Sequence, residues 1–236
     1  MITKSSSKNN FGWNMKTHKK ITEYAIKNSE LKLKSHHKKI LIDFSAQPDI
    51  DETQLHCSSH FCFKIPKDLK PKRFLSFMDF SGQNNALAKV TKHIDKAQKA
   101  LSKGKMHKAF EEIGRLAHFI GDVCVPLHTE KGSFLTKFFD AKMHIAYETG
   151  FVEPNLDKFL RPQTISPLDK KEDFKTLALN LFKENFDFSS QFIISNKNKD
   201  SWGEIAQVTM DKAVSSTQKL LEAFCDLAAP KLLDKK

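Results

Sequence analysis

Five side chains able to bind a metal, all between positions 118 and 148, constrain the fold more than any other feature of this chain. His118 and Asp122 are four residues apart, so both lie on one face of the segment if it is helical. His144 and Glu148 repeat this spacing. Pro126 cannot continue the first helix, so His128 falls just beyond its end and can turn back toward the same centre. The pattern predicts helices that converge on a metal site made of His118, Asp122, His128, His144 and Glu148.

Length and composition predict a single globular domain. The chain has 236 residues, 39% of them hydrophobic and 28% charged, which is enough material for a substantial core. The formal net charge of +11 favours a polyanionic partner, such as an anionic membrane surface, nucleic acid or a phosphate-bearing substrate. A lysine-rich solvated surface explains the same charge equally well. No apolar run has the length of a membrane span, and Met1–Gly12 lacks the apolar centre of a secretory signal.

Hydrophobic periodicity predicts an all-α fold, because apolar residues recur at helical spacing and no alternating strand pattern is convincing. The clearest stripe occupies residues 87–101 and stops at Gly104, a typical residue after a helix end. Thr17 is expected to cap a helix that reaches Asn28. The helix with His144 and Glu148 is expected to end at Gly150. The last helix is expected to begin with the capping-box pattern Ser201-x-x-Glu204 and to run toward Pro230.

Four further positions could contribute ligands, although each also has an ordinary explanation. Trp13 stands at the head of the ordered region, and His18 lies on the apolar face of the first helix, where a histidine is usually a core residue. Asp49 belongs to an acidic turn over residues 47–52, and such a turn is commonly a solvated loop. His60 lies between Cys57 and Cys62, which together with His56 raise the alternative of a zinc knuckle. The gap between these two cysteines is wide for paired zinc ligands, and no second pair follows.

Taken in order, these residues resemble the bacterial zinc-dependent phospholipases C, including the catalytic domain of the clostridial alpha-toxin type. The family pattern is Trp, His, an Asp in Pro-Asp-x-Asp, His, then His-x-x-x-Asp-x-x-x-Pro-x-His and His-x-x-x-Glu. It is matched here by Trp13, His18, Asp49, His60, His118, Asp122, His128, His144 and Glu148. The resemblance implies a single helical domain around three zinc ions over residues 13–236, preceded by an N-terminal extension, residues 1–12, that is a candidate for removal.

The resemblance also implies which residues bind each zinc. One ion is expected on Asp49, His60, His118 and Asp122, and a second on His128, His144 and Glu148. The third is expected on Trp13, His18 and the other oxygen of Asp122, which would bridge two ions. The expected reaction is hydrolysis of glycerophospholipids to diacylglycerol and a phosphorylated head group by metal-activated hydroxide, with Asp49 as general base. The expected partner is a phospholipid at a membrane surface, met by a peripheral monomer. Members of the family are exported.

Two departures from the family pattern limit what carries over. In the family the tryptophan is the mature N-terminus, whereas twelve residues precede Trp13 here. Either these residues are removed, or the true start differs, or the third zinc is bound differently or not at all. Choline-preferring members can have an aromatic residue just after the turn aspartate, where this chain has Ile50. Choline specificity therefore does not follow, and the basic charge, which includes Lys16 near the site, points to anionic head groups.

Alternatives remain for the function and for two ligands. The related zinc-dependent single-strand nucleases and 3'-nucleotidases typically end the last motif with His-x-x-x-Asp preceded by Trp, whereas this chain has Tyr147 and Glu148, which favours the phospholipase. A non-catalytic, zinc-stabilised protein that binds membranes is a third interpretation. His56 could replace His60, and Asp51 could replace Asp49. The remaining histidines are expected to be surface or lysine-flanked helix residues: His36, His37, His93 and His107.

Overall fold

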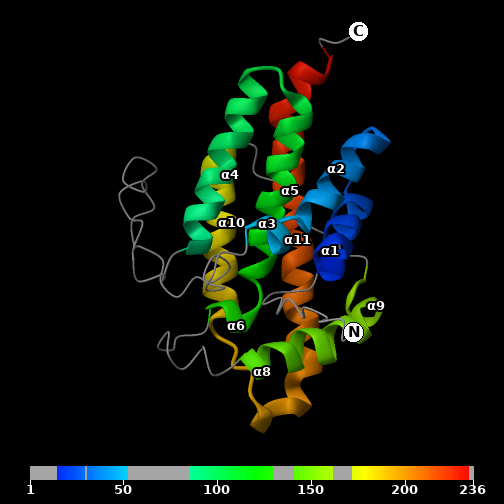
Figure 1. The fold of residues 1–236 in the computed structure, drawn as a ribbon, viewed down its shortest axis with the longest axis vertical. Helices are drawn as coiled ribbons and strands as arrows, with labels where there is room; N and C mark the ends of the chain where they lie inside the picture. Colours follow the sequence, from blue (N-terminus) through cyan, green and yellow to red (C-terminus); the bar gives the residue numbers. More distant parts are fainter. Residues whose placement is uncertain (1–14, 30, 53–84, 130–140, 162–171, 234–236) are drawn as a thin grey trace, which may run out of the picture.

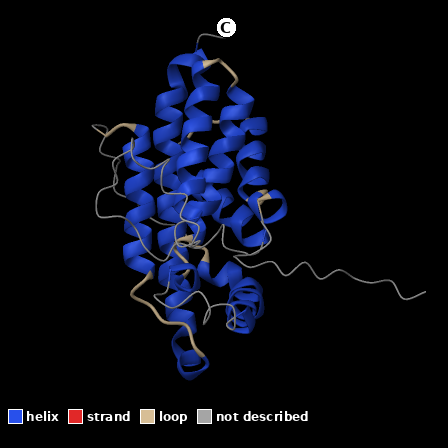
Figure 2. Cartoon of the chain, turned by 60° about the vertical axis from the view of Figure 1, so that its left-hand side comes forward, coloured by secondary structure: helices blue, strands red, loops and turns tan. Residues whose placement is uncertain are grey.

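The structure is a computed structural model in which residues 15–29, 31–52, 85–129, 141–161 and 172–233 are described. Every regular element within these ranges is a helix (Figure 2). The prediction of an all-α fold is therefore confirmed. Long helices run roughly side by side along the longest axis of the molecule, and shorter helices gather at one end (Figure 1).

The long helices form the body of the bundle, and the short ones lie below it in the view of Figure 1. The long ones are α1 (Met15–Asn28), α2 (Ser35–Ser45), α4 (Asn85–Ser102), α5 (Met106–Asp122), α10 (Phe174–Ser189) and α11 (Trp202–Leu233). A one-turn helix, α3 (Pro48–Asp51), lies on the front of the bundle. The lower end contains α6 (Pro126–Thr129), α8 (Ala141–His144), the π-helix η3 (Ile145–Val152), η4 (Glu153–Asn155), α9 (Leu156–Phe159) and η5 (Asn196–Ser201).

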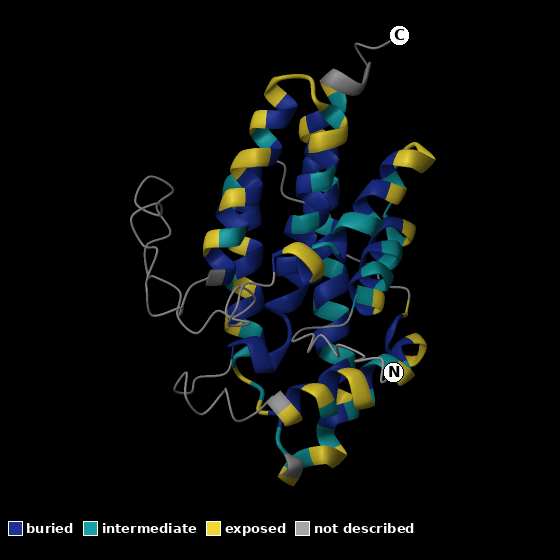
Figure 3. Cartoon of the chain, viewed as in Figure 1, coloured by how far each residue is buried: buried dark blue, intermediate teal, exposed yellow. Residues whose placement is uncertain are grey.

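Two hydrophobic clusters fill the interior, and the predicted metal motif spans the boundary between them. The larger cluster is built mainly from α4, α5, α10 and the second half of α11. The smaller one joins the lower helices to the first half of α11. Residues 116–129 are all buried, although a surface helix would expose one face (Figure 3). The lower end of α5 and the turn after it therefore occupy the centre of the domain.

The end of α4 follows its sequence signal. Gly104 has φ of +67°, a backbone conformation that favours glycine. The Gly104 amide donates to the Leu101 carbonyl, and the Lys105 amide donates to the Ala100 carbonyl. These two hydrogen bonds are those of the Schellman motif that often terminates helices, so the stop predicted at Gly104 is confirmed.

Other predicted helix ends agree less well, because neighbouring structure decides them. Thr17 does not cap α1, which already begins at Met15 and buries Thr17 within it. Helical structure continues past Gly150 to Val152, because Phe151 and Val152 pack in the hydrophobic cluster that contains Trp202. The last helix begins at Trp202, directly after Ser201, as predicted. Ser201 does not form the predicted capping box, because its hydroxyl donates to the Asn198 carbonyl; a capping box is found instead at Ser195, before η5. The last helix also continues beyond Pro230 to Leu233.

Gly114 sets how closely α2 approaches α5. A Cβ atom at this position would lie 2.8 Å from the Leu41 carbonyl oxygen and 2.8 Å from Phe44 Cβ. Only glycine leaves room for such an approach, because these neighbours include backbone. The chain leaves α2 directly into α3, so the contact at Gly114 also determines where the acidic turn meets α5.

Candidate metal centre

The predicted ligands gather in two buried groups at the lower end of the long helices. His18, His118 and Asp122 form the first group, in which α1 meets the end of α5. His128, His144 and Glu148 form the second group, from α6, α8 and η3. These elements lie close together in Figure 1, with α6 and α8 directly below α5. We call the two groups the first cluster and the second cluster.

In the first cluster, the two oxygens of Asp122 face two different imidazoles. Oδ1 lies 3.1 Å from His18 Nε2, and Oδ2 lies 3.1 Å from His118 Nε2. The two rings stack with their centroids 3.8 Å apart. Asp49 joins this cluster from α3, with its Oδ1 3.7 Å from His118 Nε2. A carboxylate placed in this way between two imidazoles is suited to bridging two ions.

The second cluster presents three ligand atoms to one point. His128 Nε2 and His144 Nε2 are 3.0 Å apart. Glu148 Oε1 lies 2.7 Å from His144 Nε2 and 3.4 Å from His128 Nε2. His144 and Glu148 are one turn apart, where α8 passes into the π-helix η3. Helices of this type are rare in proteins overall, but those that occur are often found at functional sites.

Both clusters fit zinc by donor type and by spacing. Two ligands of one tetrahedral zinc, each about 2.0–2.1 Å from the ion, are roughly 3.3 Å apart. The separations in the second cluster, from 2.7 to 3.4 Å, bracket this distance. In addition, Asp49 Oδ2 is buried and receives no hydrogen bond from the described residues, which is costly unless a cation or another group satisfies it.

The buried carboxylates remain charged because imidazoles surround them. Burial acts to raise the pKa of Asp122, but His118, His128 and His18 outweigh it and hold that pKa well below the ordinary range. Burial likewise acts to raise the pKa of Glu148, and His144 and His128 outweigh it and lower that pKa. Deprotonated carboxylates are the form that binds metal.

Several residues that the sequence did not single out hold the ligands in place. The ring of His118 hydrogen-bonds through Nδ1 to the Ser45 carbonyl at 2.9 Å, which directs Nε2 toward the cluster. On α10, the Asn185 amide donates to the Ile120 carbonyl, and the Ser189 hydroxyl donates to the Val123 carbonyl. Thr129 also hydrogen-bonds to Ser189, at 2.8 Å. These bonds fix the turn that separates Asp122 from His128.

The sequence carried a signal for part of this support and none for the rest. Asn185 and Ser189 interrupt an apolar stripe on α10 at helical spacing, and polar residues in such a stripe indicate buried hydrogen bonding. The partner of His118 at Ser45, by contrast, is a backbone carbonyl. Every residue has one, so the sequence gives no indication of this hydrogen bond.

The predicted ligands that fall in described segments come together in space. Trp13 and His60 lie outside the described residues, as do His56, Cys57 and Cys62. Asp51, the alternative to Asp49, is exposed and bound to Arg115, so Asp49 is the carboxylate that faces His118.

His93 and His107 lie on helices beside lysines, as expected, whereas the surface position expected of His36 and His37 is found only for His36. His36 and His107 are exposed. His37 and His93 are buried, because His37 stacks on Phe110 and His93 lies between two glutamates. The cysteines in the described segments, Cys124 and Cys225, are free and buried, and burial raises the pKa of the Cys225 thiol to about 12.

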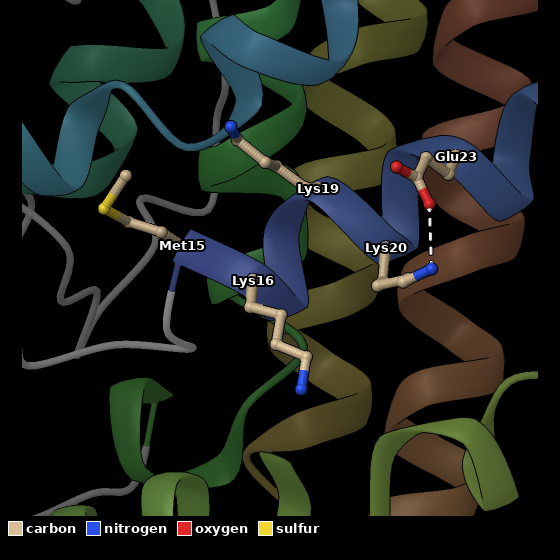
Figure 4. A pocket seen from close by; sticks show the side chains of 5 residues that line it. All are labelled: Met15, Lys16, Lys19, Lys20 and Glu23. Atoms are coloured by element: carbon tan, nitrogen blue, oxygen red, sulfur yellow. Dashed lines mark ion pairs between the residues drawn. The ribbon is translucent and has the colours of Figure 1, made fainter.

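A basic pocket lies along the start of α1, the helix that carries His18. It has a volume of about 380 Å³ and is lined by Met15, Lys16, Lys19, Lys20 and Glu23 (Figure 4). Lys20 pairs with Glu23 at 3.2 Å, and Lys19 lies 3.4 Å from Asp43. The lining therefore contains three lysines and one glutamate, and Asp43 lies beside Lys19.

The family model for zinc-dependent phospholipase C matches residues 17–215. This chain belongs to that family. The match includes His18 and every later ligand described above. It supports zinc as the metal of the two clusters and confirms the resemblance inferred from the motifs.

Solved structures show the same fold. The alpha toxin from Clostridium absonum has a TM-score of 0.64 and 19% identity over 94% of this chain and 65% of its own length. The alpha-toxin of Clostridium perfringens from avian strain SWCP has a TM-score of 0.67 and 20% identity, covering 93% of this chain and 64% of that one. The chain thus spans about two thirds of these proteins. A comparison with curated protein sequences gives no match. In the described segments, no helix is both long and apolar enough to cross a bilayer.

Proposed function

We propose that this protein hydrolyses glycerophospholipids in the manner of a phospholipase C, releasing diacylglycerol and a phosphorylated head group. The observation that carries the proposal is the convergence of two buried His/carboxylate clusters on the ends of one turn, residues 122–128, in a chain of the zinc-dependent phospholipase C family. We place this activity in residues 13–236 and regard residues 1–12 as an extension that precedes the catalytic domain.

The proposed ligand sets follow the two clusters. His128, His144 and Glu148 would hold one zinc. Asp49, His118 and Asp122 would hold a second with His60, and His18 would hold a third with Trp13 and the far oxygen of Asp122. When bound, zinc ions lower the pKa of water and draw charge from a phosphoryl oxygen. The two ligand oxygens of Asp122 would keep neighbouring ions at a fixed separation.

We assign Asp49 a second role as the general base. Its Oδ2 receives no hydrogen bond from the described residues, whereas Oδ1 faces His118. One oxygen can therefore face a metal while the other accepts a proton from water at the reacting phosphorus. The neighbouring side chain, Ile50, is 46% exposed and marks the outer side of this turn.

For the substrate we propose a phospholipid with an anionic head group. An aliphatic side chain at position 50 offers no aromatic face to the ammonium of choline. The lysine-rich lining of the pocket on α1 and the net charge of +11 favour anionic surfaces instead. The protein would act as a peripheral monomer at the membrane surface.

The test compares three substrates with zinc-loaded protein: vesicles of phosphatidylglycerol, vesicles of phosphatidylcholine and single-stranded DNA. We expect diacylglycerol from phosphatidylglycerol at the highest rate, and loss of that activity on removal of zinc with a chelator. Hydrolysis of DNA with inert lipids would assign the chain to the nucleases instead. Bound zinc without turnover of any of the three would make it a zinc-stabilised scaffold.

A second protein that begins at Trp13 tests the N-terminal ligand. If the free amine of Trp13 binds the third zinc, this form should hold one more zinc ion per chain than the form that begins at Met1. Equal zinc content in both forms would remove Trp13 from the ligand set while leaving the proposed activity in place.

A further inference from the structure

A network of charged side chains lies outside the two clusters, where α3 meets α4 and α5. Its carboxylates are Asp51 and Glu52 at the end of α3 and Glu112 on α5; its cations are Lys89 and His93 on α4 and Arg115 on α5. We call it the α3 charge network. His93 is 1% exposed and Glu112 is 2% exposed, so part of it is fully buried. Buried charges are costly unless they are paired, and each of these is.

His93 occupies the centre of the network. Its Nδ1 lies 2.7 Å from Glu112 Oε2, and its Nε2 lies 3.0 Å from Glu52 Oε1. Lys89 donates to the other oxygen of Glu52 at 2.9 Å. Glu52 follows α3 directly, so these contacts attach the end of the acidic turn to α4.

Arg115 makes the corresponding attachment to α5. Its two terminal nitrogens donate to both oxygens of Asp51, at 2.6 and 2.7 Å, and one of them also donates to Glu52 at 2.9 Å. A bidentate arginine–carboxylate pair fixes orientation as well as distance. Arg115 lies one helical turn before His118 on the same helix, and Asp51 lies two residues after Asp49.

The short helix α3 depends on these attachments. It has four residues, and an isolated helix of this length is unstable in water. Its position is therefore set by what its residues contact. The network holds the far side of the turn on the helix that carries His118, and Asp49 faces His118 from the near side.

We infer that Arg115, supported by Glu52 and His93, is a positioning residue that holds α3 on α5 so that Asp49 faces the first cluster. The inference rests on the proposed role of Asp49 as a zinc ligand. It assigns the network a local role, since the second cluster receives no residue from α3. The effect of Arg115 on zinc binding should therefore pass through Asp49 alone.

The experiment measures zinc affinity by competition with a chelator in the full chain, for the wild type, Arg115→Gln and Asp49→Asn. Arg115→Gln should weaken zinc binding at the first cluster by about 10-fold, the lower end of the cost of losing a direct outer partner of a ligand, because Arg115 acts on Asp49 through Asp51. It should leave the second cluster unchanged. Arg161→Gln is the matched control, because Arg161 forms an exposed pair with Asp211. It should bind zinc as the wild type does.

The double variant separates positioning from general loosening. In the Asp49→Asn background, Arg115→Gln should cause no further loss of zinc affinity, whereas losses that add would overturn the inference. Equal weakening of both clusters, or wild-type affinity in Arg115→Gln, would also overturn it. Arg115→Lys, which keeps the charge but loses the planar fork, should fall between and decides the matter if Arg115→Gln does not fold. Zinc affinities that shift as expected in a protein that hydrolyses no phospholipid would support the inference and refute the proposed function.

Discussion

The two clusters use similar side chains but are held in different ways. The first cluster is assembled from three elements far apart in the sequence: α1, α3 and α5. Its geometry depends on the α2–α5 contact at Gly114, on the Ser45 carbonyl and on the α3 charge network. The second cluster comes from two nearby short segments, and its closest contact, between His144 and Glu148, lies within one helical turn.

This difference separates tertiary from local control of a metal site. Disturbing the contact between α2 and α5 should affect the first cluster and spare the second, because the turn that leads to His128 is held from α10 instead. The α5–α6 turn joins them, since Asp122 ends one helix and His128 follows in the next. Variants at the ligands, at the helix contact and at a remote buried histidine test the comparison in order of decreasing effect.

The largest effect is expected from the carboxylates themselves. Asp122→Asn removes the charge shared by two imidazoles and should lower phospholipid hydrolysis by about 10³-fold or more. It should also reduce zinc at the first cluster, where the proposed bridge lies. Glu148→Gln should inactivate the protein as well but remove only the ion of the second cluster. Zinc per chain, measured by elemental analysis beside the activity assay, distinguishes the two variants.

Asp187→Asn is the control for these substitutions. Asp187 pairs with Lys183 on the surface of α10, and its change should alter neither zinc content nor activity. An Asp122→Asn protein with full zinc content and normal activity would refute the bridging role. An equal loss of ions from Asp122→Asn and Glu148→Gln would mean that the clusters do not bind zinc separately.

A smaller effect is expected from the helix contact that supports only the first cluster. Gly114→Ala would place a methyl group 2.8 Å from the backbone of α2, which should cost about 1–3 kcal/mol of unfolding free energy. Movement of α2 would carry Ser45 and α3 with it, so zinc should be lost from the first cluster before the second. Denaturant unfolding and zinc titration measure the two consequences.

Gly203→Ala is the matched control, because its Cβ would meet only Phe151 Cζ, at 3.9 Å. This is an ordinary contact, and alanine is the better helix former, so stability should stay the same or rise slightly. Equal destabilisation by both substitutions, or loss of zinc from the second cluster first in Gly114→Ala, would contradict the proposed dependence.

The sequence predicted the second cluster more completely than the surroundings of the first. Spacings of four residues, and the break at Pro126, specify directions that hold in any helix, so His144 and Glu148 could be paired without the structure. The sequence could not predict which segment covers His118. That depends on Gly114 and Arg115, whose partners lie about 70 and 64 residues away along the chain. The burial of His93 shows the same limit of prediction from sequence. Its lysine-rich neighbours in the chain suggested an exposed residue, whereas its neighbours in the fold are two glutamates.

The smallest effect concerns the upper part of the α2–α5 contact. His37 on α2 stacks on Phe110 of α5, with ring centroids 4.2 Å apart. Burial, with smaller contributions from His36, Lys34 and His107, lowers the pKa of His37 to about 4. The unfolded chain takes up this proton near its ordinary pKa of about 6.5, so between pH 6.5 and 4 it binds more protons than the folded state. Stability from this group is therefore present above pH 6.5 and is lost as the pH falls toward 4.

His37→Phe should remove that part of the pH dependence while keeping a ring against Phe110. Between pH 7 and pH 5, the wild type should lose about 1–2 kcal/mol more unfolding free energy than the variant, within the 1.36 kcal/mol per pKa unit that linkage allows. Urea unfolding of the zinc-free proteins at the two pH values measures this difference, because the two proteins differ only at position 37. Identical pH dependence would mean that His37 is not held neutral in the fold. If the two proteins differ in unfolding free energy only between pH 7 and pH 5, the acid sensitivity of the α2–α5 contact is due to the His37 imidazole. The same contact supports the first cluster, so part of that support would then depend on His37 being neutral.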